Sequence, residues 1–421
     1  MARKLKMKII NTSVSYTTEK LKQPFGFKGG FLTELWQVKV CIKTNGYFGE
    51  GQGVQSILWS DAQVFADFGE FEGNKLMLEI TKYAASALLN KKIRCPIDVI
   101  DEIYLDVLKY AQEKKKVRET FVKNALVAVD NALWNLYAKI NHTEDLMSLI
   151  PDKYKNGLSF RQDKLCNIPL ITYGLKSEDI KSLLDSGSPL LKIKIGFDAG
   201  GTLSKREMVE WDFNRIKEIH QIAKEYKTEY TTSGNVLYYL DANGKYSDLE
   251  QLNAFISLLS NEGILERVIL FEEPFDENNK TNVSSIPVRF VADESIHSLN
   301  NVIERYQLGY KAIALKPIAK TLSETLKIIE KANELGMDYF CADLTVSPLL
   351  VEWNKNIAAR IKKIPEMKVG VLESNGAQNY INWEKMYSFH PFKNKKSTKP
   401  INGVYLLDEE FYQCSGGIFR N

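Results

Sequence analysis

The stretch Leu190-Leu191-Lys192-Ile193-Lys194-Ile195 places two lysines inside a short apolar run. Residues two apart in a strand point to the same side of the sheet, so both ammonium groups face the same way. A continuous apolar run of this length is typical of a parallel strand that is buried on both faces. The stretch therefore predicts an inner strand that carries two cations.

Seven similar runs occur in the same part of the chain, with amphipathic stretches in most of the gaps. Eight strand–helix units of this size predict a (β/α)8 barrel. An open doubly wound sheet is the alternative, although no GxGxxG follows the first strand of the series. The other runs are Ile168–Tyr173, Val236–Leu240, Val268–Phe271, Val288–Ala292, Ala312–Leu315, Tyr339–Ala342 and Val369–Leu372. The helical stretches are Asp212–Tyr226, Leu249–Glu262, Leu299–Leu308, Thr321–Leu335 and Leu350–Ile364.

The earlier part of the chain follows a different pattern. Two alternating segments and a glycine-rich turn predict a small antiparallel sheet, at Leu5–Thr18, Leu35–Thr44 and Gly46–Gly53. Three helical patterns follow, at Asn74–Asn90, Ile97–Gln112 and Thr120–Ile140. We therefore expect an α+β capping domain over residues 1–150 and a barrel over residues 166–394. Gly403–Tyr412 resembles a strand pair, and one option is that residues 395–421 return to the capping domain.

Composition excludes several classes of protein. The 421 residues are 44% hydrophobic and 26% charged, with a net charge of only +3, so neither nucleic acid nor an anionic membrane is an expected partner. Five cysteines, an odd number without a CxxC pair, indicate a reducing cytoplasm rather than a disulfide framework. No apolar run reaches the length of a membrane span, and Met1–Ile10 lacks the apolar core of a signal peptide.

Acidic residues follow three successive runs, in Asp241-Ala242-Asn243, Glu272-Glu273-Pro274 and Asp293-Glu294-Ser295. Parallel barrel strands end at one face, and barrel active sites lie at that face. Carboxylate oxygens without histidine or thiolate partners suit a hard cation. The sequence therefore predicts a Mg²⁺ site, with Mn²⁺ as the alternative ion.

The run Ala312–Leu315 ends in Lys316, about half a turn around the barrel from Lys194. A proton alpha to a carboxylate is very weakly acidic, and a cation bound to that carboxylate stabilises the enediolate formed on its loss. Lysines on opposite faces could remove the proton from one side and return it on the other. Lys192 and Lys194 would also depress each other's pKa, which suits a base that acts near neutral pH.

This ordered series resembles the enolase superfamily and, within it, the muconate lactonizing enzyme subgroup. The resemblance covers nearly the whole chain and implies a modified (β/α)8 barrel with an N-terminal capping domain. It implies that Asp241, Glu272 and Asp293 bind Mg²⁺. It also implies Lys194 as one acid/base, Lys192 as its electrostatic neighbour and carboxylate partner, and Lys316 as the opposite acid/base or cation stabiliser. Asn243 and Glu294 are expected to support these groups. Glu373 and Asn375 are expected either to contact the substrate or to close the barrel.

Several stretches depart from the family pattern. The mandelate racemase branch has a histidine at the end of strand seven, whereas Tyr339–Thr345 contains none. The Gly-Gly that often follows the strand-six lysine is replaced by Pro317–Thr321. Leu372–Gly376 lacks the aspartate pair with which dipeptide epimerases hold the substrate ammonium, which argues against a standard member of that group. The four histidines are expected in surface or packing roles: His142, His220, His297 and His390.

Two glycine-containing stretches are candidates for the mouth of the site. Lys20–Phe31 contains Gly29-Gly30 and is the expected flexible lid of the capping domain; the alternative is an exposed hairpin loop. Gly196–Gly201 lies in a long segment after Lys194 and is expected to border the site mouth.

The expected function is Mg²⁺-dependent proton abstraction from a small carboxylate, by an isomerase or lyase. A racemase or epimerase ranks first and a cycloisomerase second, followed by a dehydratase or an o-succinylbenzoate-synthase-like lyase. A non-catalytic carboxylate-binding barrel is the alternative from another class. The resemblance also implies a homo-oligomer.

Overall fold

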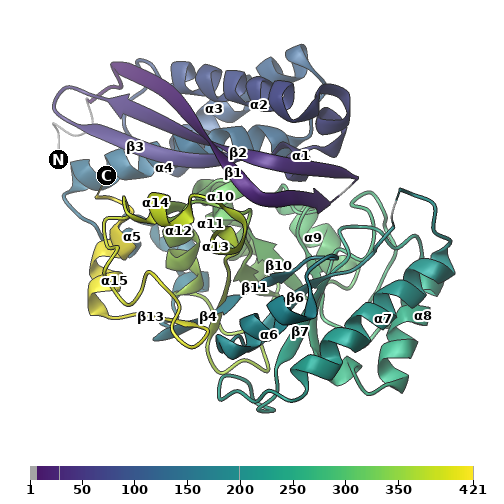
Figure 1. The fold of residues 1–421 in the computed structure, drawn as a ribbon. Helices are drawn as coiled ribbons and strands as arrows, with labels where there is room; N and C mark the ends of the chain where they lie inside the picture. The colour runs from purple at the N-terminus through teal and green to yellow at the C-terminus, as the bar shows by residue number, and fades with distance from the viewer. Residues whose placement is uncertain (1–6, 28, 199, 421) are drawn as a thin grey trace.

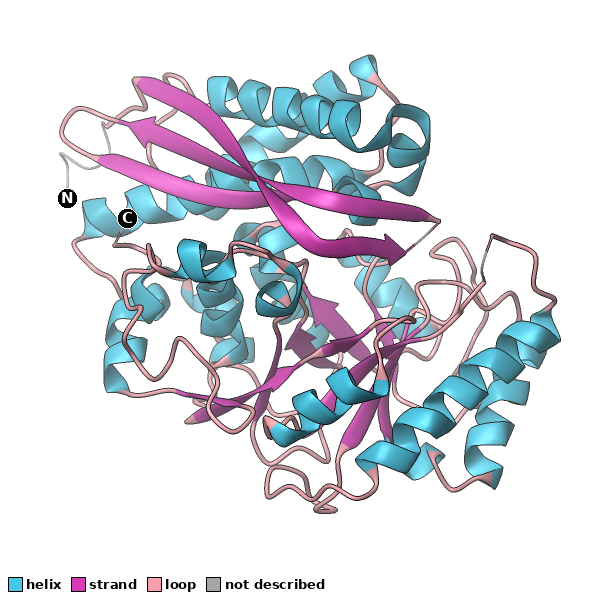
Figure 2. Cartoon of the chain, in the orientation of Figure 1, coloured by secondary structure: helices cyan, strands magenta, loops and turns pink. Residues whose placement is uncertain are grey.

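The computed structural model describes residues 7–27, 29–198 and 200–420. Figure 1 shows the N-terminal strands and helices, in purple and blue, lying over a curled sheet of teal, green and yellow segments. The upper layer is a small sheet backed by helices, and the lower layer is a parallel sheet with helices around it (Figure 2).

The capping sheet has the strand order β1-β2-β3, with neighbouring strands antiparallel. Its strands are β1 (Asn11–Phe27), β2 (Gly30–Lys43) and β3 (Phe48–Gln55). Buried residues two apart, such as Val38, Val40 and Ile42, direct one face of β2 toward the helices of the capping domain. The predicted antiparallel sheet is confirmed, except that Leu5 and Lys6 of its first segment lie outside the described residues.

The predicted loop at Lys20–Phe31 is wrong for most of its length. β1 continues to Phe27, and Phe25 pairs with Leu32 after a register shift that begins at Lys20. Strand pairing satisfies backbone groups that a loop would leave to water, and aromatic residues favour it. The resulting hairpin also reaches the barrel, because Leu21 bridges to Tyr380. Lys28, at the tip of the hairpin, lies outside the described residues.

Helices cover one face of the capping sheet (Figure 2). They are α1 (Ile57–Ser60), α2 (Ala62–Ala87), α3 (Pro96–Lys114) and α4 (Glu119–Asn141). α2 begins earlier than its apolar pattern predicts, because the carboxylate of Asp61 accepts hydrogen bonds from the backbone N–H groups of Gln63 and Val64. α4 is buried along almost its whole length, since it lies between the capping sheet and the barrel.

The strand β3 lies unusually close to α4 at its glycines. A Cβ added to Gly51 would lie 2.1 Å from the backbone N of Ala132 and 2.2 Å from the backbone O of Ala128. We expect Gly51→Ala to lower the free energy of unfolding by about 3 kcal/mol or more, because strand and helix must separate. Urea unfolding measures this. Gly174→Ala is the control, since its Cβ meets nothing within 4 Å, and an equal effect of both variants would contradict the expectation.

The larger sheet closes into a barrel. Pro169 divides one extended segment into β4, which pairs with β12, and β5, which pairs with β6. With β4 and β5 counted as one, eight parallel strands are present among the described residues. The strands are β4 (Lys164–Ile168), β5 (Leu170–Ile171), β6 (Leu190–Lys194), β7 (Leu237–Asp241), β8 (Val268–Glu272), β9 (Phe290–Ala292), β10 (Ala312–Leu315), β11 (Asp338–Cys341) and β12 (Gly370–Glu373).

Helices follow most barrel strands, which confirms the predicted (β/α)8 class. They are α6 (Ser177–Asp185), α7 (Lys205–Ala223), α8 (Leu249–Asn261), α9 (Leu299–Gln307), α11 (Leu322–Glu334) and α12 (Pro348–Ala358). Between β8 and β9 the described chain forms no helix, so the barrel is modified there. Short elements complete the chain: α5 (Leu146–Leu149), η2 (Asp152–Tyr154), η3 (Asn156–Leu158), η4 (Leu265–Arg267), α10 (Pro317–Lys320), α13 (Gly376–Asn379) and α14 (Trp383–Tyr387).

The C-terminal segment joins the barrel. The expected strand pair at Gly403–Tyr412 is wrong, because one strand, β13 (Val404–Leu406), precedes a helix, α15 (Glu409–Cys414), and the turn η5 (Ser415–Gly417). β13 pairs antiparallel with β4. The last residues also contact the capping domain, where Asn135 Nδ2 donates to the backbone O of Ile418 at 3.4 Å. Over the described part of the chain, no helix has the length and apolar character needed to cross a membrane.

Candidate active site

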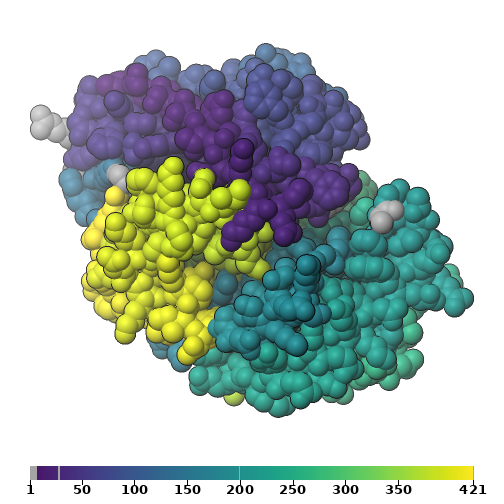
Figure 3. All heavy atoms as spheres, viewed as in Figure 1, coloured from purple at the N-terminus to yellow at the C-terminus, as the bar shows by residue number. Residues whose placement is uncertain are grey.

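A cavity lies between the capping domain and the C-terminal ends of the barrel strands. In the space-filling view the purple strands of the capping domain lie directly against the barrel (Figure 3). The capping domain contributes mainly apolar side chains: Phe25, Leu32, Leu35, Ser56 and Trp59. The barrel contributes the charged side chains and several polar and apolar ones. Its lining residues are Leu170, Lys192, Lys194, Asp241, Asn243, Glu272, Glu294, Lys316, Asp343, Leu344, Thr345, Glu373 and Asn375.

The two lysines of β6 both line this cavity, as their spacing predicts. Lys192 is buried and its Nζ lies 3.0 Å from Asp241 Oδ2 and 3.2 Å from both Glu272 Oε1 and Glu373 Oε2. Lys194 Nζ donates to Asp241 Oδ2 and to Asn243 Oδ1, each at 2.6 Å. Lys192 is thus surrounded by carboxylates, whereas Lys194 has one partner at the end of neighbouring β7 and a second two residues beyond it.

The expectation that the two lysines depress each other's pKa is wrong for Lys192. Burial alone would lower the pKa of Lys192, but the carboxylates of Asp241, Glu272 and Glu373 outweigh burial and hold it well above its ordinary value. The sequence reasoning counted the neighbouring cation and not the acidic groups that other strands bring to the same ammonium. In this structure Lys192 is therefore a protonated partner of the carboxylates and not a base.

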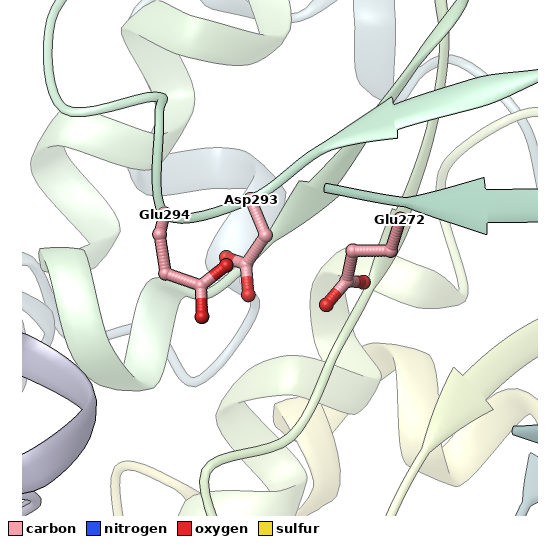
Figure 4. Close-up of side chains that lie close together, drawn as sticks. All are labelled: Glu272, Asp293 and Glu294. Carbon is pink, nitrogen blue, oxygen red and sulfur yellow. The ribbon is translucent and has the colours of Figure 1, made fainter. Parts of the chain in front are cut away.

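Carboxylates from the ends of β8 and β9 gather beside these lysines. Oxygens of Glu272, Asp293 and Glu294 all lie within 4.8 Å of one another, and all three side chains are buried. Figure 4 shows these carboxylates pointing into a common space. Burial and the neighbouring Asp293 raise the pKa of Glu272 to about 7, even though Lys192 opposes the shift. Such a group of like charges needs positive charge to be stable when ionised.

Asp241 lies beside this group but not within it. Its Oδ2 contacts both Lys192 and Lys194, and it shares Lys192 with Glu272. Burial opposes ionisation of Asp241, but the two lysines prevail and its pKa lies below the ordinary value. Of the three predicted ligands, the structure thus places Glu272 and Asp293 together with Glu294, and leaves Asp241 adjacent.

The two glutamates of Glu272-Glu273-Pro274 point in different directions. Glu272 lines the cavity. Glu273 Oε1 instead accepts hydrogen bonds from the backbone N–H groups of Asp293 and Ser295, at 2.7 and 2.9 Å, and from Ser295 Oγ at 2.5 Å. Glu273 therefore holds the end of β9, and with it the backbone of Asp293. Asn243 holds the neighbouring side chain, because its Nδ2 donates to Glu294 Oε1 at 3.1 Å.

Lys316 reaches the cavity from β10, on the wall opposite β6. It forms an ion pair with Asp293 Oδ2 and lies 4.7 Å from the ring centre of Trp59. Burial acts to lower the pKa of Lys316, but Asp293 and Glu272 raise it above its ordinary value. The predicted lysines therefore stand on facing walls of one cavity.

The sequence reasoning missed Lys320. This residue is buried, its Nζ donates to the backbone O of Asp293 at 2.6 Å, and it lies 3.3 Å from Asp293 Oδ1. Burial lowers the pKa of Lys320. Residues four apart in a helix share a face, so the spacing Lys316–Lys320 was the available signal. Asp293 is consequently flanked by two ammonium groups.

Asp343 was also given no role from the sequence. It follows β11, lines the cavity beside Glu373, and its backbone N–H donates to Glu373 Oε2 at 3.1 Å. Asn375 completes this wall, since its backbone N–H donates to Asp343 Oδ2 at 2.7 Å and its side-chain oxygen accepts from Thr345 Oγ1 at 2.8 Å. Glu373 and Asn375 thus lie at the cavity, as expected.

Other expected features lie away from the cavity. None of the four histidines lines it within the described residues. Burial lowers the pKa of His297, the nearest by sequence to a strand-end motif, to about 4. The segment Gly196–Gly201, described except for Ala199, contributes no described residue to the cavity wall. Phe197 stacks instead on Trp211, with ring centres 4.0 Å apart.

The residues present fit a hard divalent cation. Four lysines and six carboxylates either line the cavity or form ion pairs with side chains that do. When all of these groups are ionised, their net charge is −2. The metal-binding side chains of the described residues at this cavity are carboxylates, whose oxygens suit Mg²⁺ or Mn²⁺. Glu272 and Asp293 would hold the ion, together with Asp241 or Glu294.

Comparison with protein-family models gives no match for this chain, and neither does comparison with curated protein sequences. Solved structures do match. A mandelate racemase/muconate lactonizing protein from Herpetosiphon aurantiacus is 19% identical with a TM-score of 0.67, over 95% of this chain and 96% of that one. The L-Ala-D/L-Glu epimerase from Bacillus subtilis is 20% identical with a TM-score of 0.63, over 89% and 92% of the two chains.

A third similar structure is the N-succinyl Arg/Lys racemase from Bacillus cereus, which is 16% identical with a TM-score of 0.63 over 89% of each chain. All three match across the capping domain and the barrel together, because each covers most of both chains. The chain therefore has the fold of the mandelate racemase/muconate lactonizing protein and of the epimerase and racemase that it also resembles.

Proposed function

We propose that this chain is a Mg²⁺-dependent enzyme that removes the proton alpha to the carboxylate of a small acid. Racemisation or epimerisation is the first-ranked reaction and cycloisomerisation the second. The observation that carries the proposal is the pair Lys194 and Lys316, which line one cavity from opposite walls with buried carboxylates between them. That arrangement offers an amine on each face of a flat intermediate.

Other side chains of the protein hold each lysine in place. Asp241 and Asn243 orient Lys194, and Asp293 with the ring of Trp59 orients Lys316. One amine would take the proton and the other would return it on the opposite face, which inverts the carbon. When bound, a divalent cation would supply positive charge beside the substrate carboxylate and stabilise the negative charge that develops there.

Two alternatives remain as hypotheses. The same lysines would serve a lyase, such as a dehydratase or an o-succinylbenzoate-synthase-like enzyme, if a leaving group departs after proton removal. A non-catalytic carboxylate-binding barrel would not require an amine on both walls. The names of the similar structures, a racemase and an epimerase among them, favour the isomerase over either alternative.

Deuterium exchange tests the proposal. The purified chain is incubated in D2O with a panel of small carboxylates, with and without Mg²⁺, and deuterium at the alpha carbon is followed by NMR. We expect exchange for at least one acid, and only with a divalent ion. Calorimetry with Mg²⁺ alone is the companion measurement, and a chain that binds no divalent ion and exchanges no substrate would support the non-catalytic barrel.

A further inference from the structure

Two lysines share the carboxylate of Asp293. Lys316 forms an ion pair with its Oδ2, and the Nζ of Lys320 lies 3.3 Å from its Oδ1. The Nζ of Lys320 also donates to the backbone O of Asp293 at 2.6 Å. Lys320 is only 2% exposed and, unlike Lys316, it is not among the described residues that line the cavity. Lys320 therefore acts on the cavity through Asp293 and not by touching a ligand there.

The turn between β10 and α11 brings both lysines to one carboxylate. The backbone N–H of Lys320 donates to the backbone O of Lys316 at 2.8 Å, which closes a single helical turn. Residues four apart in such a turn lie on one face. Thr321 then leaves the turn with a φ of +70°, an uncommon conformation for a β-branched residue. The ring of Trp59, from the capping domain, covers both ammonium groups, with its centre 4.7 Å from Lys316 Nζ and 5.6 Å from Lys320 Nζ. Both domains thus fix the two lysines beside Asp293.

The second lysine changes the charge that a cation in the cavity would meet. Glu272, Asp293 and Glu294 carry three negative charges when ionised, and their oxygens lie within 4.8 Å of one another. Lys320 adds a positive charge beside this group without lining the cavity. Charges a few ångströms apart interact strongly where water is excluded, so Lys320 weakens the attraction of these carboxylates for a divalent ion. Its contacts also fix the Asp293 carboxylate, because they join the side chain to its own backbone.

We propose that Lys320 is a positioning residue of this site, which holds Asp293 against Lys316 and keeps the affinity for the divalent ion low. Without Lys320, the carboxylate of Asp293 would be free to turn away from Lys316 toward a bound cation. The inference rests on the proposed function, because it takes Asp293 as a metal ligand and Lys316 as an active-site amine. The role differs from those of Lys192, Lys194 and Lys316, which line the cavity themselves.

Calorimetric titration with Mg²⁺ tests the inference without requiring turnover. The variant Lys320→Met keeps nearly the length of the side chain and removes its charge. We expect Mg²⁺ to bind about 10-fold more tightly than to the unmodified chain, because one buried positive charge beside the carboxylates is gone. A lysine that only supported the fold would give the opposite result, since loosened ligands bind a metal more weakly. Unchanged or weaker Mg²⁺ binding in folded Lys320→Met overturns the inference.

Deuterium exchange provides the second measurement. With a substrate identified by the panel of carboxylates, we expect the kcat of Lys320→Met to fall about 10- to 100-fold, because Asp293 no longer holds Lys316 in a fixed position. Tighter Mg²⁺ binding together with slower exchange is the expected result. Unchanged exchange in a variant that binds Mg²⁺ more tightly overturns the positioning role.

Two further variants separate charge from the loss of a side chain. Lys320→Arg keeps the positive charge and should keep the Mg²⁺ affinity of the unmodified chain. An arginine variant that binds Mg²⁺ as tightly as Lys320→Met overturns the charge argument. The control Lys327→Met removes a lysine of α11 that pairs with Asp101 and Glu324, neither of which lines the cavity. It should change neither the Mg²⁺ affinity nor the exchange.

Thermal melting shows whether each variant folds. If Lys320→Met does not fold, Lys320→Gln takes its place, since the neutral amide keeps a donor for the backbone O of Asp293. Loss of the fold in both neutral variants overturns the inference, because the lysine would then be needed for the fold itself.

The two measurements also separate this inference from the proposed function. Tighter Mg²⁺ binding by Lys320→Met, without deuterium exchange in any chain, supports the role of Lys320 and contradicts proton abstraction. Exchange by the unmodified chain, with equal Mg²⁺ affinities of the two chains, supports proton abstraction and contradicts the role of Lys320. A chain that binds no divalent ion contradicts both.

Discussion

Replacing Lys194 by alanine is expected to abolish interconversion at the alpha carbon, with a loss of about 1,000-fold or more in kcat. Lys194 is the amine on the β6 wall, held by Asp241 and Asn243 at 2.6 Å, and alanine leaves no group there to accept or return a proton. The measurement is deuterium exchange with a substrate identified by the panel, followed separately for each stereoisomer.

Stereochemistry distinguishes two roles for the opposite lysine. If Lys316 is a second acid/base, the variant Lys194→Ala still exchanges the isomer whose hydrogen faces Lys316. If Lys316 only stabilises charge, exchange is lost for both isomers. Lys205→Ala is the matched control, because this lysine is exposed on α7 and pairs with Asp248. Unchanged exchange of both isomers in Lys194→Ala would remove Lys194 from the mechanism.

Replacing Glu272 by glutamine is expected to weaken Mg²⁺ binding by roughly 100-fold or more, since even residues that only support metal ligands change affinity by about 10- to 100-fold. The neutral amide removes one charge from the group formed with Asp293 and Glu294. The fold should survive, because Lys192 keeps Asp241 and Glu373 as partners. Calorimetric titration with Mg²⁺ measures the affinity.

Two further variants identify the third ligand. The family resemblance implies Asp241, whereas the distances between carboxylate oxygens favour Glu294. Mg²⁺ binding is compared in Asp241→Asn and Glu294→Gln. The substitution that weakens it more identifies the third ligand. Glu250→Gln on the exposed face of α8 is the control and should bind Mg²⁺ as the unmodified chain does. Undiminished binding in Glu272→Gln would contradict the proposed metal site.

The predictable part of this molecule is the part governed by local pattern. Continuous apolar runs such as Ala312–Leu315 coincide with strands, because burial on both faces leaves a clear signature. The charged residue that ends a run, such as Lys316, faces the site because parallel strands of a barrel all end at one rim. Prediction was weaker at Lys20–Phe31, where glycines and lysines suggested a loop and pairing with β2 made a strand.

Residues that act through distant neighbours were not predictable in the same way. The raised pKa of Lys192 arises from Asp241, Glu272 and Glu373, which belong to three other strands. The place of Asp343 in the cavity wall, where its carboxylate accepts from the backbone N–H of Asn375, is recognisable only once its surroundings are known. Electrostatic energy depends on distances through space, and sequence separation does not report these distances.

The periodicity of apolar residues predicts a barrel with an α+β cap, and the order of charged strand ends indicates carboxylate chemistry beside two amines. Only the packed chain reveals that Lys320 shares Asp293 with Lys316, that Glu294 joins Glu272, and that a second acidic wall faces the first. The reason is physical. Strand character is set by neighbours along the chain, whereas ion pairs, burial and unsatisfied hydrogen bonds are set by groups that folding brings together.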